Sequence, residues 1–263
     1  MTRAVLLDID GVLTVSWQAL PGAAEALDWL RSEGHPVLLV TNTSSRSRRT
    51  IAATLTEAGL PVAPDEVLTA VGAARTYLMT HHPGAACFVV NEGSLAEDLE
   101  GIELVGPDRA GVVLLGGAGP SVGYPDLNAV FRLAIAGVPV VALHHNTRFQ
   151  TADGPALDMG AFIPGLEEAA RITVPIIGKP APPLFEAALS ALGSDAGHSM
   201  MVGDDLAADV VGAQAVGITG VLVRTGKFRP DDLTGDGPRP DHVIDTIADL
   251  PDLLRDGRDG KGT

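Results

Sequence analysis

Two aspartates close the first hydrophobic run of the chain and are the first candidates for chemistry. The run Ala4–Leu7 leads directly into Asp8-Ile9-Asp10, and side chains two positions apart on a strand lie on the same face. Two carboxylates about 4 Å apart repel each other by about 4 kcal/mol at an effective dielectric near 20. Either one of them holds a proton, or a hard divalent cation lies between them.

A second acidic cluster favours the cation. The stretch MVGDDLAAD repeats the order of apolar strand, glycine and acid, and it contains Asp204, Asp205 and Asp209. These motifs offer only oxygen ligands, and Mg²⁺ typically combines a few carboxylates with water and phosphate oxygens. Gly11 and Gly203, beside the two clusters, let the backbone approach closely. The sequence therefore predicts a magnesium site.

Two other motifs could hold an anion. Thr41, Asn42 and Thr43 follow an apolar run and precede a predicted helix, and a helix N-terminus rich in hydroxyl groups is a ready anion site. Lys179, between a glycine and a proline at the end of another apolar run, is a point charge suited to a phosphoryl oxygen. Each motif alone has a common structural explanation, such as a helix cap or a turn. Their conjunction in one chain is what indicates a site.

The elements that must position these motifs alternate between strands and helices. Short apolar, β-branched runs predict strands, and apolar residues with a period near 3.6 predict helices between them. The predicted strands are 4–8, 36–40, 87–90, 112–115, 138–143, 175–177, 200–202 and 220–223, and the predicted helices include 23–32, 50–58 and 184–192. This alternation predicts an α/β fold, a Rossmann-like doubly wound parallel sheet with the polar motifs at its carboxyl edge.

Composition narrows the class of partner. The chain of 263 residues is 46% hydrophobic and carries a net charge of −15, which disfavours nucleic acid because phosphate neutralisation needs clustered bases. The single cysteine, Cys87, lies in an apolar run, and we expect it in the core without a disulfide. No apolar run is long enough to span a membrane, and the N-terminal run is too short for a signal peptide. We therefore expect a cytoplasmic protein with neither a membrane nor a nucleic-acid partner.

The order of the four motifs resembles the haloacid dehalogenase-like phosphohydrolases. The motifs are Asp8-x-Asp10-Gly, Thr41-Asn42, Gly178-Lys179-Pro180 and Gly203-Asp204-x4-Asp209, and the resemblance runs from about residue 4 to 250. It implies a Mg²⁺-dependent phosphatase that acts on a small phosphorylated compound. Covalent catalysis suits this reaction, because hydrolysis of phosphate monoesters is among the slowest uncatalysed reactions and is divided into two easier steps.

The resemblance also assigns roles to the residues. Asp8 would be the nucleophile that forms an aspartyl-phosphate, and Asp10 would protonate the leaving oxygen and then deprotonate water. The phosphoryl group would be held by Thr41, Thr43 and the backbone near Asn42, with its charge offset by Lys179. The ligands of Mg²⁺ would be Asp8, the carbonyl of Asp10 and Asp204, with Asp209 behind them.

The long interval between Thr41 and Lys179 predicts an inserted domain, because it contains three predicted strands and several helices. We expect a discontinuous catalytic core, 1–70 and 174–254, a smaller α/β cap domain, 71–173, and a disordered tail, 255–263. The resemblance then narrows to subfamily IIA, the branch with a large cap in this place. Within it, VRTGKFRPDD and LDMGAFIPGLEEAA look most like the phospholysine phosphohistidine inorganic pyrophosphate phosphatases. The family resemblance also implies a homodimer formed through the cap.

Residues of the predicted cap leave the substrate open. Asp158 lies in a turn-like stretch before an apolar helix, and we predict that it binds substrate over the phosphate site. His144 and His145 follow a predicted strand, and we interpret them as structural or substrate-facing residues and not as metal ligands. Hydrolysis of phosphoamidates or of pyrophosphate is an alternative to hydrolysis of phosphate esters. A non-enzymatic regulatory protein on the same fold is a further alternative, which the intact acid pair and lysine disfavour.

Overall fold

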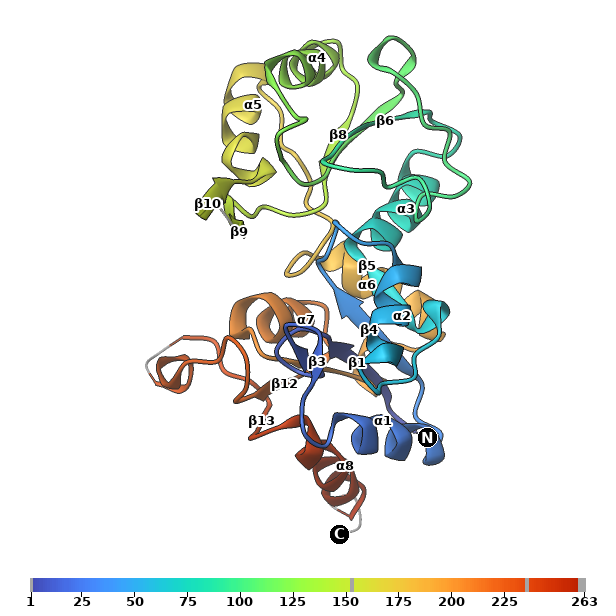
Figure 1. Cartoon of the computed structure of the whole chain (residues 1–263), viewed down its shortest axis with the longest axis vertical. Coiled ribbons are helices and arrows are strands. Elements are labelled where there is room, and N and C mark those ends of the chain that lie inside the picture. Colours follow the sequence, from blue (N-terminus) through green and yellow to red (C-terminus); the bar gives the residue numbers. More distant parts are fainter. Residues whose placement is uncertain (1, 152–153, 235–236, 260–263) are drawn as a thin grey trace. The chain divides into compact units, whose positions relative to one another are not determined.

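The computed structural model of the protein describes residues 2–151, 154–234 and 237–259 (Figure 1). The chain divides into two compact units. The first unit comprises Met1–Thr41, Arg48–Leu68 and Phe185–Thr263, and the second unit comprises Asn42–Ser47 and Thr69–Leu184. The second unit is therefore larger than the predicted insertion, because it also takes in 42–47, 69–70 and 174–184. Its role as a cap over a catalytic core stays a prediction.

A sheet of six strands forms the centre of the first unit, in the order β13-β12-β11-β1-β4-β5. The strands are β1 (Ala4–Asp8), β4 (Val37–Thr41), β5 (Val67–Thr69), β11 (Ser199–Gly203), β12 (Thr219–Val223) and β13 (His242–Ile244). The pairs β1–β4, β1–β11, β11–β12 and β12–β13 are parallel. Every residue of β1 and β11 is buried, as is typical of parallel strands covered on both faces. This architecture confirms the predicted fold class.

Helices and short turns of the first unit surround this sheet. They are α1 (Ala23–Ser32), α2 (Arg48–Glu57), α6 (Pro182–Leu192), α7 (Gly212–Ala215), α8 (Leu250–Asp259), the hairpin β2 (Thr14–Val15) and β3 (Gln18–Ala19), and the short helices η1 (Pro64–Glu66), η4 (Ala196–His198), η5 (Leu206–Val211), η6 (Pro230–Leu233) and η7 (Ile247–Asp249). Helix α1 buries Ala23, Ala26, Leu27 and Leu30 in the core beside Leu7 of β1, which is the face that its apolar period predicts. No helix within the described ranges has both the length and the apolar character needed to cross a membrane.

The second unit has a parallel sheet of its own, β6-β7-β8. Its elements are α3 (Ala70–His81), β6 (Cys87–Val90), η2 (Pro107–Arg109), β7 (Val112–Leu115), α4 (Tyr124–Ile135), β8 (Val140–Ala142), the hairpin β9 (Arg148–Thr151) and β10 (Gly154–Leu157), η3 (Met159–Ala161) and α5 (Ile163–Ala170). A separate hydrophobic core joins Leu115, Val130 and Ile163. Cys87 is buried and free, as predicted.

Two sequence predictions need correction. The stretch 175–177 forms no strand, because its pairing is a single bridge between Ile176 and Ala142, held by two backbone hydrogen bonds of 2.9 Å. The predicted disordered tail is helical over its first five residues, since α8 continues to Asp259. Arg255 stabilises this end by pairing with Asp252 at 2.7 Å and by lying 5.0 Å from the centre of the Trp29 ring. The remainder of that prediction, 260–263, lies outside the described residues.

Candidate active site

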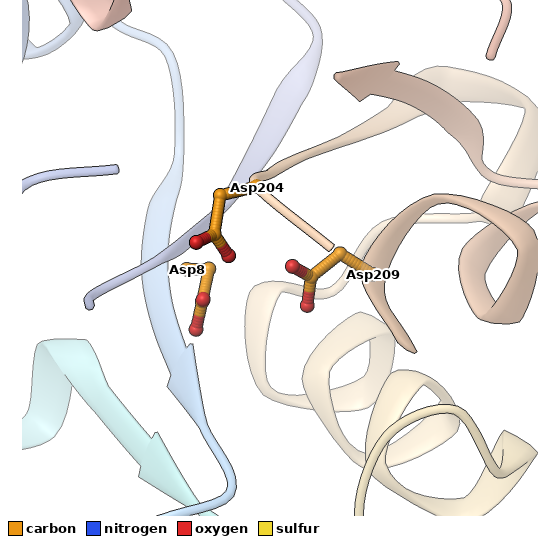
Figure 2. A group of neighbouring side chains, drawn as sticks. All are labelled: Asp8, Asp204 and Asp209. Carbon is orange, nitrogen blue, oxygen red and sulfur yellow. The ribbon is translucent and has the colours of Figure 1, made fainter. Parts of the chain in front are cut away.

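Three buried carboxylates meet at the carboxyl edge of the first unit's sheet. Asp8 ends β1, Asp204 directly follows β11, and Asp209 lies in η5. One oxygen of each lies within 4.8 Å of the other two, and Figure 2 shows the three side chains next to one another. Their exposed fractions are only 6%, 1% and 1%. The pairing of β1 with β11 explains this proximity. The two strands are parallel, and Leu7 lies opposite Val202, so that both strands end at the same level of the sheet.

Glycines leave the volume that these carboxylates occupy. Gly11 has a φ of +94°, and a Cβ atom at this position would overlap the carboxylate of Asp204. Gly226, with a φ of +59°, approaches the same carboxylate from another loop, and a Cβ atom on Gly203 would overlap Asp209. The sequence analysis identified Gly11 and Gly203, whereas no spacing signal pointed to Gly226.

The loop after β12 crosses the acidic cluster, and we call residues 225–227 the strap. The hydroxyl of Thr225 donates to the carbonyl of Gly11, and the backbone N–H of Lys227 donates to Asp204 Oδ2 at 2.7 Å. The Lys227 amine lies 3.7 Å from Asp205 Oδ2. Burial of this amine lowers its pKa, but the negative charges of Asp204, Asp8, Asp205 and Asp209 outweigh burial and raise it. The strap therefore adds a permanent positive charge to the acidic site.

Asp205 is separate from the three-carboxylate cluster. Its Oδ1 accepts hydrogen bonds from the backbone N–H groups of Ala207, at 3.1 Å, and Ala208, at 3.0 Å. It thereby caps the N-terminus of η5. Its own backbone N–H donates to Asp209 Oδ2 at 3.1 Å. Asp205 thus fixes the turn that presents Asp209.

The cluster fits a divalent cation. Asp8, Asp204 and Asp209 supply hard oxygen donors, and ligand bonds of about 2.0–2.6 Å place two oxygens on one ion at most about 5 Å apart. Their separation of at most 4.8 Å meets that limit. Burying three carboxylates together without compensation would be costly. The donor set therefore fits a divalent cation, and that this cation is Mg²⁺ stays a prediction.

Asp10 is positioned differently from the sequence expectation. Strand β1 ends at Asp8, so the alternation of side chains along a strand does not extend to Asp10. Asp10 instead forms an isolated bridge with Thr14 and is exposed to solvent. The strand alternation from which the sequence analysis placed both carboxylates on one face therefore does not apply to Asp10. The proposed roles of Asp10, as proton shuttle and as a carbonyl ligand, stay predictions.

The two motifs predicted to bind an anion, Thr41–Thr43 and Lys179, are joined by hydrogen bonds between a side chain and the backbone. Thr41 is the buried last residue of β4. The Asn42 side chain donates to the Lys179 carbonyl and accepts from the Lys179 N–H, both at 2.8 Å. A Cβ atom on Gly178 would overlap the Asn42 amide, which explains the glycine before the lysine. Lys179 is 7% exposed.

Helix α2 begins only at Arg48. The residues Thr41–Thr43 therefore do not form a helix N-terminus, which corrects the physical reason given for an anion site there. Binding of a phosphoryl group by Thr41, Asn42, Thr43 and Lys179 stays a prediction from the family resemblance.

Asp158 joins two loops inside the second unit. Its Oδ1 accepts hydrogen bonds from the backbone N–H groups of Ala118, at 2.9 Å, and Met159, at 2.8 Å. Its Oδ2 lies 3.8 Å from Nε2 of His144, which is also buried. Burial lowers the pKa of His144, and the charge of Asp158 opposes that shift only in part. These contacts give Asp158 a structural role, and its predicted contact with substrate is untested.

Two family models and a group of curated relatives match this chain over most of its length. A family model described as haloacid dehalogenase-like hydrolase matches residues 5–104, and a second, described as HAD-hydrolase-like, matches residues 176–250. The human haloacid dehalogenase-like hydrolase domain-containing protein 2 is 35% identical over 252 residues, which cover 93% of this chain and 95% of that protein. The phospholysine phosphohistidine inorganic pyrophosphate phosphatase of Rattus norvegicus is 33% identical over 258 residues, 96% of this chain and 94% of that protein.

Solved structures share the fold over nearly the whole chain. NagD from Escherichia coli K-12 superposes with a TM-score of 0.85 at 27% identity, covering 94% of this chain and 98% of that one. A p-nitrophenyl phosphatase from Archaeoglobus fulgidus gives a TM-score of 0.85 at 29% identity, covering 96% of this chain and all of that one (100%). The likeness therefore includes both compact units.

Proposed function

Because the chain belongs to the haloacid dehalogenase-like hydrolases, we propose that it is a phosphohydrolase that removes phosphate from a small phosphorylated compound with the help of a divalent cation, Mg²⁺. The observation that carries the proposal is the buried cluster of Asp8, Asp204 and Asp209 at the carboxyl edge of the sheet. Relatives named as phosphatases support the same reaction class.

The reaction proceeds in two displacement steps. Asp8 attacks phosphorus, an aspartyl-phosphate forms, and the departing oxygen takes a proton from Asp10. Asp10 then removes a proton from water, which attacks the same phosphorus and releases phosphate from Asp8. Asp8, Asp204 and Asp209 would hold the divalent cation, which would supply positive charge to stabilise the phosphoryl group. Lys179 offsets charge on the phosphate.

Substitution of the nucleophile tests this function. Asp8→Asn should lower turnover of p-nitrophenyl phosphate at least a thousandfold, about 4 kcal/mol in activation free energy, because an amide is a poor nucleophile. Asp28→Asn, which removes an exposed carboxylate on α1, is the matched control and should retain full turnover. EDTA should abolish turnover by the wild type, and added Mg²⁺ should restore it. Retention of more than a tenth of the activity in Asp8→Asn would exclude covalent catalysis by Asp8.

The second unit is our candidate for substrate selection, and its likeness to a phospholysine phosphohistidine inorganic pyrophosphate phosphatase favours one alternative substrate class. Phosphate esters, phospholysine, phosphohistidine and pyrophosphate should therefore be compared by kcat/KM on one preparation. Preference for a P–N or P–O–P bond by at least tenfold would select the alternative. A homodimer through the second unit and a cytoplasmic location remain predictions, and light scattering tests the former.

A further inference from the structure

Lys227 holds a cationic side chain beside the acidic cluster, and the reaction steps above do not use it. Two hydrogen bonds hold the strap in place. The Thr225 hydroxyl donates to the Gly11 carbonyl, and the Lys227 backbone N–H donates to the Asp204 carboxylate. The side chain remains 63% exposed while its amine lies 3.7 Å from Asp205 Oδ2. The backbone of Lys227 is therefore anchored on the Asp204 carboxylate, while its charged side chain is exposed at the edge of the site.

The charge balance of the site explains what this amine can do. Asp8, Asp204, Asp205 and Asp209 together bring four negative charges, and a divalent cation neutralises only half of them. The Lys227 amine carries a positive charge at neutral pH, as a lysine ordinarily does. The same positive charge repels a divalent cation that enters the cluster, and this repulsion acts over several ångströms at a partly exposed site.

We propose that Lys227, through its positive charge, limits the affinity of the acidic cluster for its cation. Without a cation, the amine offsets part of the repulsion among the carboxylates. With a cation bound, it weakens binding and favours exchange. This inference rests on the cation site of the proposed function, but not on which substrate is hydrolysed.

Calorimetric titration with Mg²⁺, and with Mn²⁺ as a second probe, tests the inference without any substrate. Lys227→Met should bind the cation about tenfold more tightly, because a unit positive charge is removed near the ion. Lys227→Arg keeps that charge and should stay within about twofold of the wild type. Arg224→Met is the matched control: it removes one positive charge from the same loop, where Arg224 pairs with Asp245 at 2.7 Å. Its Kd should equal that of the wild type.

Thermal unfolding supplies a second measurement. In EDTA, Lys227→Met should melt at a lower temperature than the wild type, because the carboxylates lose a counter-charge, and saturating Mg²⁺ should raise its melting temperature by more. High salt should shrink the difference in Kd. An unchanged or weaker affinity in Lys227→Met would overturn the inference while leaving the phosphohydrolase proposal intact. Failure of the wild type to bind any divalent cation would overturn both.

Discussion

Substitution of Gly11 by alanine measures how tightly the acidic cluster is packed. Two costs are expected. A φ of +94° is strained for any residue with a Cβ atom, at about 1–2 kcal/mol. The new methyl group would also displace the Asp204 carboxylate, which accepts the 2.7 Å hydrogen bond from Lys227. A hydrogen bond to a charged group contributes about 1.5–3 kcal/mol. Together these costs predict that Gly11→Ala lowers the free energy of unfolding by about 2.5–5 kcal/mol.

Gly59 provides a matched control for the backbone cost. Its φ is +89°, nearly that of Gly11, and a Cβ atom there would meet nothing within 4 Å. Gly59→Ala should therefore cost only about 1–2 kcal/mol. The difference between the two variants isolates the clash with Asp204.

Urea unfolding in EDTA, followed by tryptophan fluorescence, measures both variants, since Trp17 and Trp29 pack against the first unit's core. Calorimetry with Mg²⁺ gives the second measurement: Gly11→Ala should bind at least tenfold more weakly, and Gly59→Ala should match the wild type. Equal destabilisation by the two substitutions, together with unchanged cation affinity in Gly11→Ala, would refute the close packing of Gly11 on Asp204.

Four further results are expected. Asp10→Asn should lower kcat strongly yet keep the Mg²⁺ Kd within a few fold of the wild type, because only its carbonyl is a predicted ligand; calorimetry beside kinetics checks this. Asp158→Ala should change KM and the ranking of substrates more than Mg²⁺ dependence, which a substrate profile tests. Burial raises the pKa of the Cys87 thiol to about 11, so a disulfide reagent at pH 8 should label it only after unfolding. Because the pKa of His144 is lowered from 6.5, the unfolded chain binds the extra proton and stability should fall as pH drops below about 7; His144→Gln should flatten that part of a urea-midpoint profile.

The sequence predicts best those elements that have a strong local pattern. Strands 4–8, 87–90 and 112–115 and helix 23–32 have their predicted bounds, because each is a continuous apolar run or a regular 3.6-residue period. The missed strands β5 and β13 have three residues each, which is too short for a periodic signal. The β9–β10 hairpin gives no sequence signal, because RFQT and GPAL lack apolar alternation.

The residues of the candidate site also divide into those with a local sequence pattern and those without one. Asp8, Asp204 and Asp209 could be identified because acids that end or follow an apolar run, close to a glycine, form a visible motif, and adjacent parallel strands bring such motifs together. The strap could not be predicted, since Lys227 reaches Asp204 through a backbone N–H that any residue but proline possesses. The exposed position of Asp10 depends on where β1 ends, and the apolar pattern resumes directly after it.

Covalent capture of the phosphoryl group tests the central claim most directly. The wild type should be mixed with ³²P-labelled acetyl phosphate and Mg²⁺, quenched in acid within milliseconds, digested, and its labelled peptide sequenced. The account predicts an acid-stable, hydroxylamine-sensitive label on the peptide that contains Asp8, and no label in Asp8→Asn. A label on another residue, or steady release of phosphate with no labelled protein at any quench time, would contradict it.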